Sequence, residues 1–268
     1  MSRHLAPWLL ALAAASAAAQ PLPPITVHAA GSLRAALTDV ARAYEAQHPG
    51  QGITLTFGPS GLLKDRIAGG EAAQVFASAN MTHPQALHAQ GKAEPVRAFA
   101  RNALCALAAP GFSLQGKPLP RRLLDADVRV ATSTPKADPA GDYAFEMFER
   151  VESSGSAAAG ATAALKAKAL LLTGGPSSPQ PQPGRSLYGQ LMAEGRADVF
   201  ITYCTNAAEA RREVPALQVL PVPEAVTVAA RYGVTLVTPA TDGARRFLDF
   251  LLSPPAQALL AAQGFSSP

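Results

Sequence analysis

Short apolar runs alternate with amphipathic helical segments along this chain, and this alternation constrains its fold more than any other feature. Five runs in the first half are typical of buried β-strands: ITVHAA (25–30), ITLTF (53–57), VFASA (75–79), LCALAAP (104–110) and VRVAT (128–132). After the first run, apolar side chains recur at helical spacing, at Leu33, Leu37, Val40, Ala41 and Tyr44. The alternation predicts an α/β protein whose sheets carry helices on both faces.

The same pattern continues in the second half of the chain. A helix is predicted from about Tyr143, a strand at DVFITY (198–203), further strands at VTVAA and GVTLV, and two helices in ARRFLDFLLS and PAQALLAAQGF. Two stretches interrupt the pattern. SSGSAAAGA (153–161) has a flexible composition and GGPSSPQPQPG (174–184) is rich in proline, so both are expected as surface loops.

The first residues have the features of a secretory signal peptide. Arg3 and His4 precede an apolar stretch that is shorter than the roughly 20 residues of a membrane span, and small residues follow before Gln20. We therefore expect cleavage after Ala19, leaving residues 1–19 as the signal peptide of an exported, soluble protein. Cys105 and Cys204 are the two cysteines, and an exported protein either joins them or leaves them free.

The charge pattern disfavours nucleic acid as a partner. The formal net charge is only +4, and the lysines and arginines form no block. No H-E-x-x-H pattern or cluster of cysteine and histidine is present, so the sequence does not support a catalytic metal site.

At four junctions, small residues or residues with a hydroxyl group stand at the start of a predicted helix. They are Gly31-Ser32, Ser60-Gly61, Ala140-Gly141 and Gly184-Arg185-Ser186. A helix N-terminus carries unpaired N–H groups and a partial positive charge, so several that converge form an anion site. Taken alone, each junction is weak evidence for an anion site, and Ser32 or Ser60 in isolation is better explained as a cap that stabilises its helix.

Taken in order, the motifs AAGSL, FGPSGLL, VFASAN, DPAGDYA and ITYCTNA, followed by LLSPPAQALLAAQGF, resemble the molybdate-binding periplasmic proteins of ABC importers (ModA-type). The resemblance implies a type II periplasmic-binding-protein fold, in which hinge strands join two α/β lobes that enclose a ligand cleft. Residues 20–102 and 225–268 would form the first lobe, and residues 103–224 the second. It also implies a periplasmic monomer that carries no cofactor and works with an ABC permease and its ATPase.

Carried over motif by motif, the resemblance implies five ligand contacts. Hydroxyls of Ser32, Ser60 and Tyr203 and backbone amides at Ala140 and near Arg185 would donate hydrogen bonds to molybdate or tungstate. The chain departs from the family pattern in two places. Glycine and proline flank Ser60 where the family has a serine-rich run, and Arg185 replaces a small apolar residue.

The chemistry of the ions leaves alternatives open. Molybdate, tungstate and sulfate carry no proton at neutral pH, so their sites need donors and avoid a facing carboxylate. Phosphate keeps a proton, so its site benefits from an acceptor, and Asp138 and Asp142 flank Ala140. A receptor for sulfate or phosphate is therefore an alternative.

Two other classes of function fit less well. An exported hydrolase would use Ser60 or Ser32 as nucleophile, but GPSG only partly matches the G-x-S-x-G elbow. A ferric-ion receptor would favour pairs of tyrosines with carboxylates, and Tyr203 alone is well placed. We therefore expect a binding protein and not an enzyme.

Overall fold

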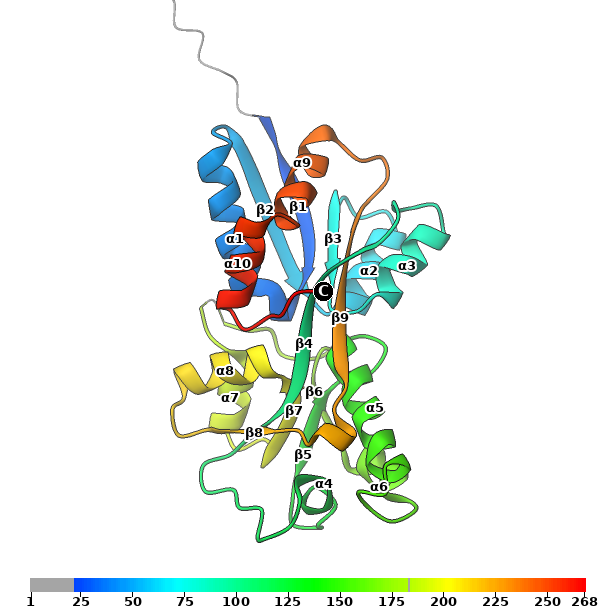
Figure 1. The fold of residues 1–268 in the computed structure, drawn as a ribbon, viewed down its shortest axis with the longest axis vertical. Coiled ribbons are helices and arrows are strands. Elements are labelled where there is room, and N and C mark those ends of the chain that lie inside the picture. Colours follow the sequence, from blue (N-terminus) through cyan, green and yellow to red (C-terminus); the bar gives the residue numbers. More distant parts are fainter. Residues whose placement is uncertain (1–21, 183) are drawn as a thin grey trace, which may run out of the picture.

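Two strands, β4 (Arg97–Ala108) and β9 (Ala229–Leu236), run through the middle of the molecule and join two α/β lobes (Figure 1). The computed structural model describes residues 22–182 and 184–268, so the predicted signal peptide lies outside the described residues. β4 pairs with β9 over residues 97–103 and then with β7 and β8 over residues 104–108. One long strand thus belongs to the sheets of both lobes.

The first lobe is built on the strand order β2-β1-β3-β9. Its strands are β1 (Leu22–Ala30), β2 (Gln51–Gly58) and β3 (Val75–Ser78), and its helices are α1 (Arg34–Gln47), α2 (Ser60–Ala68), α3 (Thr82–Ala89), α9 (Asp242–Leu251) and α10 (Pro254–Ala262). Figure 1 places α1, α9 and α10 on one side of the sheet and α2 and α3 on the other. The 3₁₀ turn η1 (Gly31–Leu33) leads from β1 directly into α1.

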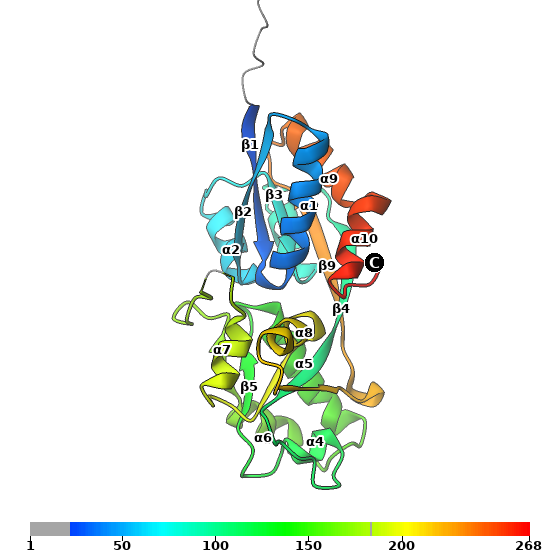
Figure 2. The same ribbon diagram turned by 90° about the vertical axis from the view of Figure 1, so that its left-hand side faces the viewer.

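The second lobe continues from β4 through β7, β5 and β6, with β8 on the other side of β4. Its strands are β5 (Val130–Ser133), β6 (Leu170–Thr173), β7 (Val199–Tyr203) and β8 (Gln218–Pro221), and its helices are α4 (Leu119–Arg122), α5 (Pro139–Ser153), α6 (Ala161–Lys168), α7 (Leu187–Ala193) and α8 (Cys204–Glu213). A second 3₁₀ turn, η2 (Glu224–Val226), precedes β9. Figure 2 shows this lobe below the first, with β4 passing between them.

Apolar faces position the elements as the sequence predicts. On α1 the buried side chains are Ala36, Leu37, Val40, Ala41 and Tyr44, and the Tyr44 ring meets Phe247 of α9 edge-on with centroids 5.3 Å apart. The predicted α/β architecture of two lobes with connecting strands is confirmed. Where the lobe boundaries fall at 102/103 and 224/225 stays a prediction.

Some elements differ from expectation. Helix α5 begins at Pro139 and not near Tyr143, because the Asp138 side chain caps it by accepting a hydrogen bond from the Ala140 amide. The stretch VTVAA is not a separate strand, since β9 begins only at Ala229. In residues 22–182 and 184–268, every helix is too short or too polar to cross a membrane.

Candidate functional site

A pocket lies between the two lobes and encloses about 120 Å³. By the same measure one water molecule needs roughly 10–15 Å³, so the pocket admits a ligand of several heavy atoms. The first lobe contributes the β1–η1 junction, the end of β2 and Arg34. The second lobe contributes Asp138, residues 173–175 and 178–181, the start of α7, and the β7–α8 junction. Strand-to-helix junctions from both lobes therefore face one space.

Ser32 of the first lobe and Tyr203 of the second both line this pocket, and both lie next to Tyr232. Ser32 Oγ forms a hydrogen bond of 2.9 Å with the Tyr232 hydroxyl of β9. Tyr203 ends β7 and is buried at 1% exposure, and its hydroxyl makes no hydrogen bond of normal geometry among the described residues, although the nearby Tyr232 hydroxyl contributes to its raised pKa. A buried hydroxyl without a partner is costly unless a ligand or water satisfies it. Burial raises the pKa of Tyr203, so the hydroxyl stays protonated and able to donate.

Arg185 lines the pocket mouth, but its guanidinium is engaged elsewhere. Its Nε donates to Glu213 Oε1, and the amide of Ser186 donates to Glu213 Oε2 at 2.6 Å. These hydrogen bonds lower the pKa of Glu213, the amide of Ser186 having the largest effect. The arginine is exposed and paired, and thus adds little unbalanced positive charge to the pocket.

Ser60 and Ala140 are not among the residues that line the pocket. Ser60 is buried at 1% exposure, and its Oγ accepts a hydrogen bond of 3.1 Å from the Ala79 amide, while its neighbour Pro59 lines the pocket. The Ala140 amide donates to Asp138 Oδ1 at 3.0 Å. Of the five predicted contacts, Ser32, Arg185 and Tyr203 line the pocket. The backbone amides of Ala140 and Arg185 already donate to Asp138 Oδ1 and to the Gln182 carbonyl. The Ser60 hydroxyl accepts from the Ala79 amide and keeps its own proton to donate.

The site also contains charged residues that the predicted set does not include. Asp138 lines the pocket beside Tyr188 and Tyr203, and burial raises its pKa to about 6. Arg34, in the first turn of α1, lies over the Phe57 ring with its guanidinium carbon 4.6 Å from the centroid, and Glu209 of α8 faces the pocket. Burial lowers the pKa of Arg34 and raises that of Glu209, and their mutual attraction opposes both shifts. Arg34 lies two residues after Ser32 in the sequence, which was an available signal, whereas Glu209 lies a turn and a half of helix beyond Tyr203.

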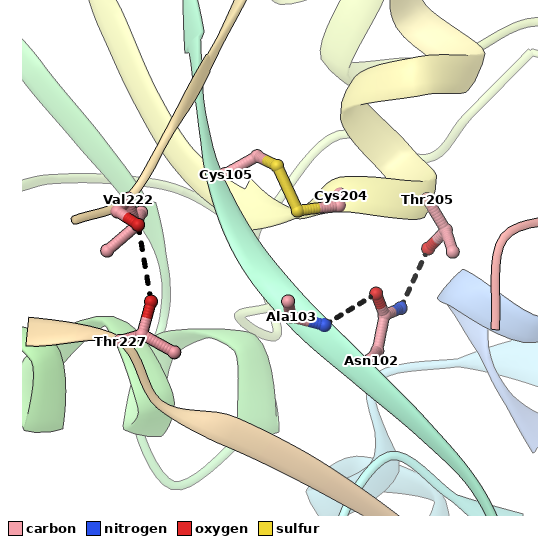
Figure 3. Close-up of a disulfide and its surroundings, with 7 residues drawn as sticks. All are labelled: Asn102, Ala103, Cys105, Cys204, Thr205, Val222 and Thr227. Atoms are coloured by element: carbon pink, nitrogen blue, oxygen red, sulfur yellow. Dashed lines mark hydrogen bonds between the residues drawn. A yellow bond between two sulfur atoms is a disulfide. The ribbon is translucent and has the colours of Figure 1, made fainter. Parts of the chain in front are cut away.

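A polar network connects the Ser32 wall to the second lobe through both central strands. Asn102 of β4 donates to the hydroxyl of Thr205 on α8 at 2.9 Å (Figure 3). It also donates to the Tyr232 hydroxyl at 3.4 Å. Beside it, a disulfide joins Cys105 of β4 to Cys204, the first residue of α8, with Cα atoms 4.8 Å apart. The residue that follows Tyr203 is therefore covalently attached to the strand that links the lobes.

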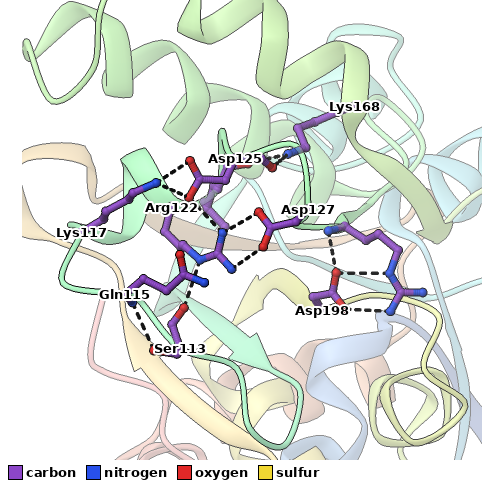
Figure 4. Close-up of polar contacts among 10 residues, drawn as sticks. Ser113, Gln115, Lys117, Arg122, Asp125, Asp127, Lys168 and Asp198 are labelled. Atoms are coloured by element: carbon purple, nitrogen blue, oxygen red, sulfur yellow. Dashed lines mark hydrogen bonds and ion pairs between the residues drawn. The ribbon is translucent and has the colours of Figure 1, made fainter.

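A second cavity, in the second lobe, is a poor anion site. Arg122 lines it, but all three guanidinium nitrogens are occupied by the Ser113 carbonyl and the carboxylates of Asp125 and Asp127 (Figure 4). The cluster instead ties the loop before α4 to the loop before β5. In the described part of the chain, histidines, cysteines and acids form no group of three that would hold a metal ion.

The family model for bacterial extracellular solute-binding proteins matches residues 25–266. The chain belongs to this family. The uncharacterized protein PM1146 of Pasteurella multocida (strain Pm70) is 35% identical over 225 residues, which is 84% of this chain and 90% of that protein.

Three solved structures share the fold of this solute-binding protein and cover 91% of the chain. The molybdate-binding protein of Azotobacter vinelandii has a TM-score of 0.69 at 21% identity over 99% of its chain. The sulfate-binding protein SubI of Mycobacterium tuberculosis H37Rv has 0.74 at 19% over 86%. PEB3 of Campylobacter jejuni, with L-phospholactate bound, has 0.68 at 16% over 100%. The predicted periplasmic-binding-protein fold is confirmed.

Proposed function

We propose that this solute-binding protein captures a tetrahedral oxyanion between its lobes and delivers it to an ABC permease. The observation that carries the proposal is the Tyr203 hydroxyl, which is buried, protonated and without a hydrogen bond among the described residues, and which belongs to a residue that lines the pocket together with Ser32. A hydrogen bond to an ionised acceptor contributes about 1.5–3 kcal/mol, so a few such donors support tight capture.

The resemblance of the sequence motifs to molybdate-binding proteins favours molybdate or tungstate as the ligand. The structural neighbours support the wider class, because by name they include binding proteins for molybdate and for sulfate, and one with a bound phospho-acid. The chain would act in the periplasm after removal of residues 1–19. Lobe closure about β4 and β9 would be a hinge motion of the kind that presents a closed, loaded receptor to its transporter.

A thermal-shift panel tests the proposal directly. The purified protein is heated with sodium molybdate, tungstate, sulfate or phosphate, with sodium chloride at matched ionic strength as the control. A ligand that binds only the folded state raises the unfolding midpoint in proportion to its occupancy. We expect at least one oxyanion to raise the midpoint in a saturable manner. Equal midpoints in all five salts would contradict oxyanion capture.

The alternative of an exported serine hydrolase has little support. Ser60 is buried and accepts a hydrogen bond from a backbone amide, and Ser32 shares its hydroxyl with Tyr232. In the described residues neither serine has a histidine as a hydrogen-bond partner, so neither has a general base in place.

A further inference from the structure

Besides Glu209, which is attracted to Arg212 and Arg34, a second carboxylate lines the pocket, that of Asp138. It is the N-cap residue of α5, and its Oδ1 accepts the Ala140 amide at 3.0 Å. Oδ2 points toward Gly174, where an added Cβ would lie only 2.6 Å from that oxygen, and both residues line the pocket. The amide that an incoming anion would use at this helix start is therefore already engaged by a negatively charged group of the protein.

The surroundings of Asp138 do little to neutralise it. Among the described residues no lysine or arginine forms an ion pair with it, and the nearest charged influence is the carboxylate of Asp142 on the same helix. Asp138 raises the pKa of Tyr188 of α7 and of Tyr203 of β7, and the Ser133 hydroxyl of β5 lowers the pKa of Asp138. Arg34 and Glu209 also line the pocket. A second full negative charge beside this carboxylate, without a proton between them, is unfavourable.

Oxyanions differ in how they meet such an acceptor. Molybdate, tungstate and sulfate present only lone pairs, so they repel an ionised Asp138. Phosphate retains an O–H at neutral pH and donates it to a carboxylate in a charge-assisted hydrogen bond. The pKa of about 6 leaves Asp138 mostly ionised at neutral pH and hence available as an acceptor.

Resting on the proposed capture of an oxyanion, we propose that Asp138 determines which ion is taken. Its carboxylate accepts a hydrogen bond from an O–H of the ligand, so the pocket selects a tetrahedral oxyanion that keeps a proton at neutral pH, with inorganic phosphate as the simplest probe. Ser32 and Tyr203 supply donors to the remaining oxygens. The ion named by the sequence resemblance is then not the preferred one.

The variant Asp138→Asn tests this assignment without removing the cap. Asparagine caps helices as well as aspartate does, so α5 keeps its start. Its amide donates where the carboxylate accepted. Isothermal titration at neutral pH should show that the native protein prefers phosphate to sulfate and to molybdate by about tenfold or more, and that Asp138→Asn lowers or reverses that preference by a similar factor.

Asp142→Asn is the matched control. Asp142 lies on the same helix, accepts the Lys136 amide at 2.7 Å and does not line the pocket, so its variant should keep the native preference. A native protein that binds molybdate or sulfate as tightly as phosphate overturns the role of Asp138 and leaves oxyanion capture standing. The role also fails if Asp138→Asn weakens all ions by one common factor. If the native protein shows no binding heat with any of these ions, both the proposed oxyanion capture and the role of Asp138 are wrong.

Discussion

The amide of Gly61 donates a hydrogen bond of 2.8 Å to the carbonyl of Ala137, and this contact joins the two lobes. Gly61 lies in the first turn of α2, and Ala137 lies just before α5. A Cβ on Gly61 would lie 2.3 Å from the Lys136 carbonyl and 2.7 Å from the Ala137 carbonyl. Only glycine allows the backbones of the two lobes to approach this closely.

Gly61→Ala should therefore impair closure more than folding. Alanine favours the helical conformation, so an open protein gains slightly in helix stability, whereas the closed form acquires a clash with rigid backbone. We expect ligand affinity to fall by about tenfold or more and the unfolding midpoint without ligand to change little. Titration with the tightest-binding oxyanion and small-angle scattering with and without it measure the two effects.

Gly69→Ala is the control for that experiment, because Gly69 is exposed at the other end of the same helix. It should leave both affinity and scattering unchanged. Native affinity in Gly61→Ala would show that the contact with Ala137 is not needed for the bound state.

Tyr203→Phe should separate binding from stability. The hydroxyl is buried without a partner in the described residues, so its removal costs the ligand-free protein nothing and relieves an unsatisfied polar group. The unfolding midpoint should stay level or rise. The affinity for the oxyanion should fall by about tenfold or more, because one hydrogen bond to an ionised ligand is lost. Unchanged affinity would remove the hydroxyl from the site.

The sequence predicts the architecture well because it depends on local patterns. The apolar face of α1 and the β-runs at β1, β3 and β7 need only the chain itself to be recognised. Helix α6 and strand β6 were missed, since an alanine- and glycine-rich stretch before them has no clear periodicity. Helix α5 begins before the predicted start near Tyr143, because Asp138 caps it and Pro139 occupies its first position.

The site is harder to predict, because its hydrogen bonds depend on which groups meet in space. Ser32 and Tyr203 share the pocket as the motifs imply, whereas Ser60 Oγ is bonded to the Ala79 amide. The Asp138 cap on the Ala140 amide is a local interaction that the Asp-Pro pair signals, although the position of its carboxylate in a pocket between lobes is not local. No local pattern states that Cys105 meets Cys204 across 99 residues, because that contact is a product of the tertiary fold.

Replacing both cysteines by alanine should destabilise the protein and loosen the pocket. The disulfide closes a loop of 99 residues, and cross-links of this kind contribute about 2–4 kcal/mol by restricting the unfolded chain. It also anchors the start of α8 directly after Tyr203. We expect denaturant unfolding at lower concentration together with weaker oxyanion binding. If stability falls while affinity is retained, the disulfide serves folding alone and does not position Tyr203.

The pH dependence of stability should reveal Asp138 in the absence of any ligand. Its folded-state pKa of about 6 lies above the ordinary value of 3.8, so the folded protein holds this proton more tightly than the unfolded chain does. Its contribution to stability is therefore greatest in acid and is lost as the pH rises from about 4 to about 6. Asp138→Asn lacks this titration. Both proteins are unfolded with urea in phosphate-free buffers across that range. The free energy of unfolding of the variant should increase relative to that of the native protein as the pH rises, and the difference should become constant above about pH 6. Parallel curves would mean that Asp138 has no raised pKa, and the carboxylate would then be hydrated and not part of a closed pocket.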